Sequence, residues 1–202
     1  MKPESISVLP ADGRTRLRVL PLLLAFLLVV AGALVATTSA EAASKTYTVK
    51  PSKTVSVPLS SSTFADGSAT ATFSLPALPA KGASAYTSVV LRNGAKGSYF
   101  AQVRVYPTGT LQLSIKRAAK SGAQQTITTL VGPAQHSSKL VAKKGVLVRL
   151  TASGTKTVTL NAVAQVYGKQ IRVTAKDSSS SRISTAGAAL AQFYAGGAKT
   201  DT

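Results

Sequence analysis

The sequence of 202 residues predicts an all-β protein, a sandwich or barrel of antiparallel strands preceded by an apolar N-terminal segment. Three observations lead to this prediction. After residue 43, short runs alternate between apolar and polar side chains, a period that is typical of strands with one buried face. Val, Thr and Tyr, which suit a pleated surface, are frequent in these runs. Turn sequences such as Asn93-Gly94 and Ser121-Gly122 separate the runs.

Residues 1–42 are predicted to be a targeting segment. Arg14, Arg16 and Arg18 precede an apolar run at 19–36, and Ala40-Glu41-Ala42 fits the small-residue pattern of a cleavage site. We therefore expect cleavage after Ala42, a secreted or extracellular protein, and one domain over residues 43–202. The apolar run also has nearly the length needed to span a bilayer, so retention of residues 19–36 as an N-terminal anchor helix is the alternative.

Eleven strands are predicted in the domain, because alternating runs and turn residues follow one another along it. They cover residues 45–50, 54–59, 70–75, 86–92, 99–106, 110–117, 125–131, 146–152, 157–166, 170–176 and 188–194.

The strongest pattern is a hairpin at 98–117. Tyr99 and Val103 belong to its apolar face, whereas Gln102 and Arg104 belong to its polar, cationic face. The connecting Pro107-Thr108-Gly109 suits a three-residue loop, since glycine takes positive φ at little cost.

The composition limits what the protein can be. The sequence has no Cys, which excludes disulfides, thiolate metal sites and cysteine nucleophiles, so the fold must rest on its apolar core. The net charge is +18, and residues 43–202 hold 20 Lys and Arg against three Asp and no Glu. Such an excess favours anionic partners. Nucleic acid is not expected, because the protein is predicted to be exported.

We expect no enzymatic activity, no cofactor and no metal site. Glycoside hydrolysis needs two carboxylates at a set separation, and the three Asp lie far apart in the sequence. His136 stands in a polar segment that we interpret as a solvated loop, without an orienting Asp or a nucleophile beside it. The usual N and S ligands of zinc are missing, and three Asp are few for calcium.

Several motifs together resemble a known family. They are the R-L strand before Thr151–Thr155, the I-R-V-T-A-K-D strand at 171–177, the A-G at 186–187, the hairpin described above and the segment at 70–94. Over roughly residues 45–202 the chain resembles the concanavalin A-like (laminin G-like) jelly-roll domains of bacterial secreted proteins. The resemblance implies a two-sheet antiparallel jelly-roll sandwich and brings no catalytic motif. The family's usual last strand is missing, so we expect residues 47–59 to take its place or an edge to stay open.

The remaining candidate for function is a polar sheet face. The candidate ligand-binding residues are Gln102, Arg104, Tyr106, Gln112, Lys116, Arg149 and Arg172. Rings that could stack on a ligand belong to Tyr99, Phe100, Tyr106, Tyr167 and Tyr194.

Arg binds carboxylate or phosphate in two-point contacts, and Gln amides suit sugar hydroxyls. We therefore predict a non-catalytic, lectin-like module that binds an anionic glycan or cell-envelope polymer. The alternative is an assembly module that pairs with a partner protein by strand addition at an open edge. Membrane contact is expected only through the N-terminal segment, and a solvated, ligand-free sheet face remains the simplest alternative.

Overall fold

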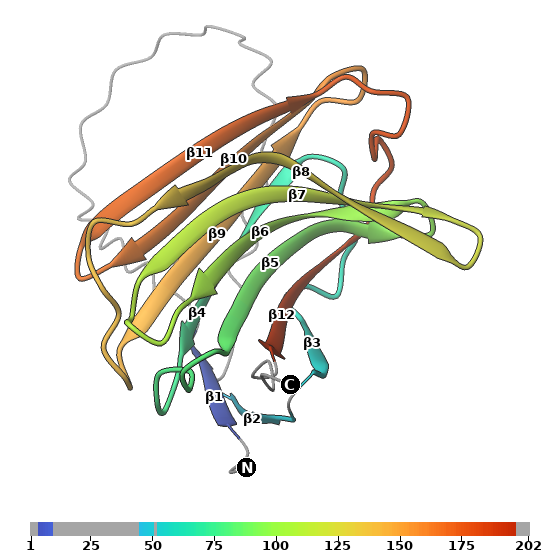
Figure 1. Ribbon diagram of the computed structural model, residues 1–202. Helices are drawn as coiled ribbons and strands as arrows, with labels where there is room; N and C mark the ends of the chain where they lie inside the picture. The colour runs from blue at the N-terminus through green and yellow to red at the C-terminus, as the bar shows by residue number, and fades with distance from the viewer. Residues whose placement is uncertain (1–3, 10–44, 51, 197–202) are drawn as a thin grey trace, which may run out of the picture.

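The protein is a sandwich of two antiparallel sheets with six strands each, as a computed structural model shows over residues 4–9, 45–50 and 52–196 (Figure 1). One sheet, sheet A, contains β1 (Glu4–Leu9), β2 (Lys45–Val49), β4 (Gly67–Ser74), β9 (Gly145–Ser153), β10 (Val158–Val166) and β11 (Lys169–Asp177). Sheet B contains β3 (Thr54–Pro58), β5 (Ser84–Gly94), β6 (Gly97–Val105), β7 (Leu111–Ser121), β8 (Gln124–Gln135) and β12 (Ala188–Gly196). The strand orders are β11-β10-β9-β4-β1-β2 in sheet A and β3-β12-β5-β6-β7-β8 in sheet B.

The predicted all-β class and the two antiparallel sheets are confirmed. The eleven strands predicted after residue 43 correspond to β2 through β12. The largest differences are in β7, which continues past residue 117 to Ser121, and in β8, which continues past residue 131 to Gln135. Its pairing with β7 shifts register twice beside this extension, between Leu113 and Ile115 and between Ile115 and Lys116.

The N-terminal region differs from the prediction in one respect. The predicted cleavage site and the apolar run at 19–36, with its anchor helix, lie outside the described residues. Ahead of them, Glu4–Leu9 forms β1, which lies between β2 and β4 in sheet A, with Ile6 opposite Tyr47 and Val8 opposite Phe73. Within the described ranges, no helix is long and apolar enough to cross a membrane.

The core lies between the two sheets and takes one face of the strands whose side chains the structure describes. Tyr99, Val103 and Val105 of β6 are fully buried, while Gln102 and Arg104 between them face away from the core. Across the sandwich, Phe73 of β4 meets Phe193 of β12 edge to face, with ring centroids 4.8 Å apart. Such contacts couple the sheets, because aromatic pairs gain energy beyond the area that they bury.

The predicted hairpin is present as β6 and β7, with Arg104 opposite Gln112. The amide of Gly109 donates to the carbonyl of Tyr106 at 2.9 Å, and Gly109 has a φ of 76°. A Cβ at this position would lie 2.3 Å from the carbonyl oxygen of Leu140. Glycine is thus required both for its backbone conformation and for the close approach of the next loop.

The position beside β12, opposite β5, is filled from within the chain by β3. β3 pairs with β12 over five residues, from Leu190 opposite Pro58 to Tyr194 opposite Thr54. The described strands that remain at sheet edges are β3 and β8 in sheet B and β2 and β11 in sheet A. Any strand addition by a partner would have to use these.

A buried ion pair fixes the loop that follows β11. Asp177 is 2% exposed, and its carboxylate accepts hydrogen bonds from the Tyr99 hydroxyl, from Arg117 and from both the amide and the hydroxyl of Ser179. Burial alone would raise the pKa of Asp177, but the hydrogen bonds from Ser179, Arg117 and Tyr99 outweigh it and hold that pKa below its usual value. Burial raises the pKa of Tyr99.

A second buried arginine joins three loops at the same end of the sandwich. Arg92 is fully buried and donates to the carbonyls of Ala65, Ile183 and Gly154 at 2.5, 2.6 and 2.8 Å. It also pairs with Asp66 at 3.1 Å. The two carboxylates whose side chains the structure describes, Asp66 and Asp177, are therefore both engaged in internal ion pairs.

Candidate functional site

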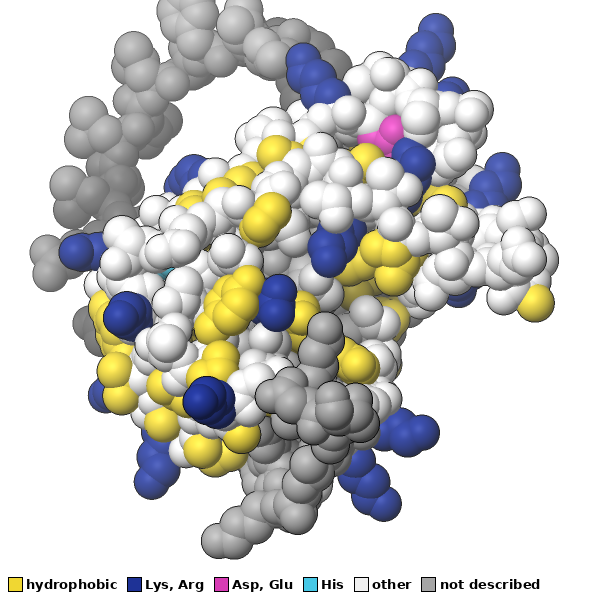
Figure 2. All heavy atoms as spheres, viewed as in Figure 1, with side chains coloured by type: hydrophobic (Ala, Val, Ile, Leu, Met, Phe, Trp, Pro, Cys, Tyr) yellow, Lys and Arg dark blue, Asp and Glu magenta, His cyan; other side chains and the backbone are white. Residues whose placement is uncertain are grey.

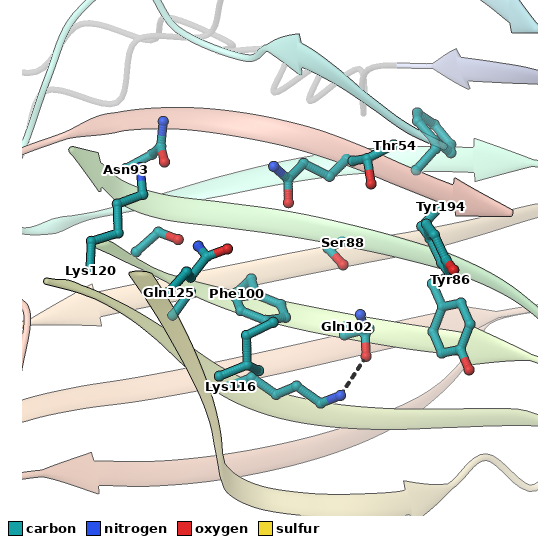
Figure 3. Close-up of a pocket in the computed structure, with 15 residues that line it drawn as sticks. Thr54, Tyr86, Ser88, Asn93, Phe100, Gln102, Lys116, Lys120, Gln125 and Tyr194 are labelled. Carbon is teal, nitrogen blue, oxygen red and sulfur yellow. Dashed lines mark hydrogen bonds between the residues drawn. The ribbon is translucent and has the colours of Figure 1, made fainter. Parts of the chain in front are cut away.

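The outer face of sheet B, on the side away from the core, carries a trough of about 660 Å³ (Figure 3). All six strands of the sheet contribute to it. The lining residues are Thr54, Tyr86, Ser88, Asn93, Ser98, Phe100, Gln102, Lys116, Ala118, Lys120, Gln125, Ile127, Gln192, Phe193 and Tyr194. Because side chains on one face of a sheet stand in rows across neighbouring strands, the trough can be described row by row.

The first row is aromatic and cationic. Tyr194 of β12 lies opposite Tyr86 of β5, and their ring centroids are 5.7 Å apart. Tyr86 in turn lies opposite Arg104 of β6. The Arg104 guanidinium stands 5.5 Å from the Tyr86 ring and 4.3 Å from the ring of Tyr106, so it is held between two aromatic faces. Tyr194, 38% exposed, leaves an accessible ring at the end of the row.

The second row is polar and uncharged. Register places Ser56, Gln192, Ser88, Gln102 and Ser114 side by side across five strands. Some of these groups are already paired, since the Gln192 amide donates to the Ser56 hydroxyl at 3.1 Å. The row therefore offers hydroxyl and amide groups that donate and accept hydrogen bonds along a line that crosses the strands.

The third row consists of apolar side chains followed by Lys116. Val90 and Phe100 pack with Ala118 and Leu190 into a small cluster separate from the main core. Lys116 lies opposite Phe100 and ends the apolar part of the row. The trough thus has an apolar floor on one side, tyrosines on the other, and polar groups between them.

Lys116 is one of the two lysines that line the trough, and Lys120 is the other. Its ammonium donates to the side-chain oxygen of Gln102 at 2.7 Å, as the dashed line in Figure 3 shows. Burial, and next the repulsion from Arg104, lower the pKa of Lys116. An ammonium has three donors, and a neutral amide balances none of its charge. Both carboxylates with described side chains are occupied elsewhere, so the charges of Lys116 and Arg104 are not neutralised by them.

The structure divides the predicted site residues between two surfaces. Gln102, Arg104, Tyr106, Gln112 and Lys116 are brought together on sheet B, where Tyr106 also donates to Gln112 at 2.7 Å. The candidates Arg149 of β9 and Arg172 of β11 lie instead on the outer face of sheet A.

The two sheet A arginines lie opposite Val163 of β10, one on each side, and Val163 is 3% exposed. The seven candidates therefore do not form one surface, because β9 and β11 belong to the other sheet.

Sequence reasoning missed some of the trough and misplaced other residues. Tyr86, Ser88 and Gln192 line the trough but were not predicted, although the alternation of β5 and β12 already gave the face on which they lie. Of the predicted stacking rings, Phe100 and Tyr194 line the trough, whereas Tyr99 is fully buried in the core.

His136 corrects the interpretation of its segment as a solvated loop. It is 4% exposed, and its Nδ1 accepts from the Ser138 amide at 2.9 Å while its Nε2 lies 3.1 Å from the carbonyl oxygen of Lys169. Nε2 thus links the segment after β8 to the first residue of β11, whereas Nδ1 binds within the loop that follows β8. In the described part of the chain, no three His, Cys, Asp or Glu side chains are grouped so that they could hold a metal ion.

Comparisons with known proteins give a distant likeness to a solved structure. No protein-family model and no curated protein matches the chain. Among solved structures, the chain is similar to the crystal structure of Scytalido-glutamic peptidase with a peptide based transition state analog, at 13% identity and a TM-score of 0.40. The match covers 63% of this chain and 56% of that chain.

This comparison corrects the prediction that the chain is no enzyme. The matching solved structure is that of an enzyme, a peptidase, so the absence of activity is not carried further. A likeness at this TM-score assigns neither a reaction nor a catalytic residue to the chain.

Proposed function

We propose that the trough of sheet B binds an anionic carbohydrate or cell-envelope polymer outside the cell. The observation that carries this proposal is the placement of Lys116, with no described carboxylate to neutralise it, in a trough that also presents tyrosine rings and a row of hydroxyl and amide groups. The predicted export of the protein and its resemblance to lectin-like jelly-roll domains support the same function.

Each row of the trough suits one part of such a ligand. The rings of Tyr86 and Tyr194 offer apolar faces for the C–H faces of sugar rings, and Gln192 and Gln102 suit their hydroxyls. Lys116 keeps two ammonium donors for a carboxylate, sulfate or phosphate, and a charge-assisted hydrogen bond of this kind is worth about 1.5–3 kcal/mol. Because the polar row crosses five strands spaced about 4.8 Å apart, an extended polymer can lie along it.

The test is retention of the full chain on immobilised polygalacturonate. We expect Lys116→Gln to weaken retention roughly tenfold or more, as the loss of one charge-assisted hydrogen bond implies. Tyr86→Ala should weaken it as well. Arg149→Gln is the matched control, because it removes an equal charge from the outer face of sheet A and should leave retention unchanged.

Salt and a neutral matrix complete the test. Retention should fall between about 0.1 M and 1 M salt, as the screening length shortens from roughly 10 Å to 3 Å. An uncharged dextran matrix should retain the protein weakly at both concentrations. Equal retention of Lys116→Gln and the unaltered chain, or an equal loss in Arg149→Gln, would overturn the proposal.

A further inference from the structure

A different surface stands at one end of the sandwich, where the β8–β9 loop and the β10–β11 turn meet. We call it the loop end and define it as residues 136–144 together with 167–169. Val141 and Tyr167 are 58% and 51% exposed, two of the four large hydrophobic residues that the described part of the chain leaves exposed. They lie together, since the Val141 amide donates to the Tyr167 hydroxyl at 3.0 Å.

Lysines lie close in sequence to these two apolar residues. The exposed lysines of the loop end are Lys139, Lys143, Lys144 and Lys169. Figure 2 shows hydrophobic and basic side chains interspersed over this end, on the left in that view.

The described carboxylates are at the other end of the strands. Asp177 pairs with Val158 at the start of β10, whereas Lys169 pairs with Val166 at its end, roughly 26 Å away at 3.3 Å per residue. Asp66 bonds the amide of Gly154, beside the same far end. The loop end therefore has a positive charge that these carboxylates do not balance.

The loop end is held in place by contacts to the rest of the sandwich. Leu140 is 2% exposed, and its amide donates to the carbonyl of Gly109 at 2.8 Å. The Lys143 amide donates to the carbonyl of Leu75 at 2.6 Å. His136 bridges to the backbone of Lys169. The apolar tip is therefore presented by a fixed scaffold.

Two residues of the loop end have large side chains at positions with positive φ, a backbone conformation that glycine adopts at lower cost. Lys143 has a φ of 65° and Tyr167 a φ of 51°, and such values are uncommon for side chains of this size. This backbone strain is carried at the two positions that supply a charge and an exposed ring.

We propose that the loop end docks onto the surface of an anionic lipid bilayer. Val141 enters the boundary of the hydrocarbon, Tyr167 lies at headgroup depth as aromatic residues do at membrane interfaces, and the lysines contact the anionic headgroups. Exposed apolar residues beside several lysines fit a bilayer better than a polysaccharide, which has no hydrocarbon interior to receive Val141. The loop end lies at the ends of the strands, so in this orientation the strands point away from the bilayer surface. The trough on the outer face of sheet B then stays accessible to solvent.

The proposal is tested by flotation of the full chain with two kinds of vesicle, phosphatidylcholine alone and phosphatidylcholine with about a third phosphatidylglycerol. The predicted apolar run at 19–36 would contribute equally to binding to both kinds of vesicle. The difference in binding between them therefore measures the contribution of the lysines. The loop-end variant replaces four lysines with glutamine, at Lys139, Lys143, Lys144 and Lys169. The control variant makes the same change of charge at Lys53, Lys96, Lys156 and Lys176, which are exposed and lie outside the loop end.

We expect the loop-end variant to lose binding to the anionic vesicles by roughly fivefold for each lysine removed, whereas the control variant stays near the unaltered chain. Val141→Ser should also weaken binding, and this loss should persist at high salt because it involves no charge. Equal binding of the two four-lysine variants would overturn the proposal. So would loss of polygalacturonate retention by the loop-end variant with unchanged vesicle binding. Lys116→Gln should leave vesicle binding unchanged, which separates this surface from the trough.

Discussion

Replacing Asp177 with asparagine should destabilise the protein strongly, because the change leaves a buried arginine without its counter-charge. Arg117 is 8% exposed, its Nε has no hydrogen-bond partner, and its Nη1 lies 2.8 Å from the Asp177 carboxylate. Removing one partner of a buried pair costs about 3–5 kcal/mol. Asparagine also presents an NH₂ group to donors such as the Tyr99 hydroxyl. We therefore expect Asp177→Asn to lose about 3–5 kcal/mol of unfolding free energy near neutral pH.

The pH dependence of this loss distinguishes a charge effect from a packing effect. The pKa of Asp177 is lower in the folded protein than its ordinary value of 3.8, so the ionised carboxylate stabilises the fold above that value. This stabilisation disappears as the pH falls through the lowered folded-state pKa. The gap between the unaltered chain and Asp177→Asn should thus be constant above about pH 5 and narrow below it.

The assay is urea denaturation at a series of pH values, with Asp66→Asn as the matched control. The Asp66 side chain is 64% exposed, and its partner Arg92 keeps three carbonyl acceptors, so this change should cost only about 1 kcal/mol. Equal losses in the two variants, or a gap for Asp177→Asn that does not change on acidification, would refute the assignment of Asp177 as a buried counter-charge.

Three further predictions concern the core, the hairpin and the trough. Phe193→Ala should cost about 3–5 kcal/mol in urea denaturation, because it removes the aromatic contact between the sheets. Gly109→Ala should cost about 3 kcal/mol or more, since its Cβ would meet the Leu140 carbonyl; Gly122→Ala, with positive φ but open space, should cost only about 1 kcal/mol. Burial lowers the pKa of Lys116, so its ammonium loses its proton at a lower pH than that of an ordinary lysine. As the pH is raised, polygalacturonate retention should therefore fall before ordinary lysines titrate. Lys116→Arg should keep retention over this pH range, because arginine stays charged.

The strands could be predicted from the sequence because each has one buried and one polar face. In β6 the alternation of Tyr99 and Val103 with Gln102 and Arg104 gives both the strand and its inward side. The sheet to which each strand belongs could not be predicted in the same way. Arg104 and Arg149 both face outward from alternating strands, and only the strand order places them on opposite faces of the sandwich.

Two other differences have local causes. The alternating Ser5-Ile6-Ser7-Val8 already carried the pattern of a strand, but the basic residues and apolar run after it led us to assign the whole segment to targeting. His136 has mostly polar neighbours in sequence, which favoured a solvated loop. Its burial depends on backbone partners at Ser138 and Lys169, and composition does not reveal such partners.

The distribution of charge connects the stability of the fold with its proposed binding surfaces. Asp66 and Asp177 are engaged in ion pairs that fix loops at one end of the strands, so they leave the cations of the trough and of the loop end unbalanced. The two surfaces differ in what accompanies their cations, since the Lys116 ammonium is hydrogen-bonded to the Gln102 amide whereas the loop-end lysines lie near exposed Val141 in the sequence. Salt should therefore separate them. Raising it to about 1 M should release polygalacturonate from the trough, while the part of vesicle binding that depends on Val141 should remain, because apolar burial is not screened.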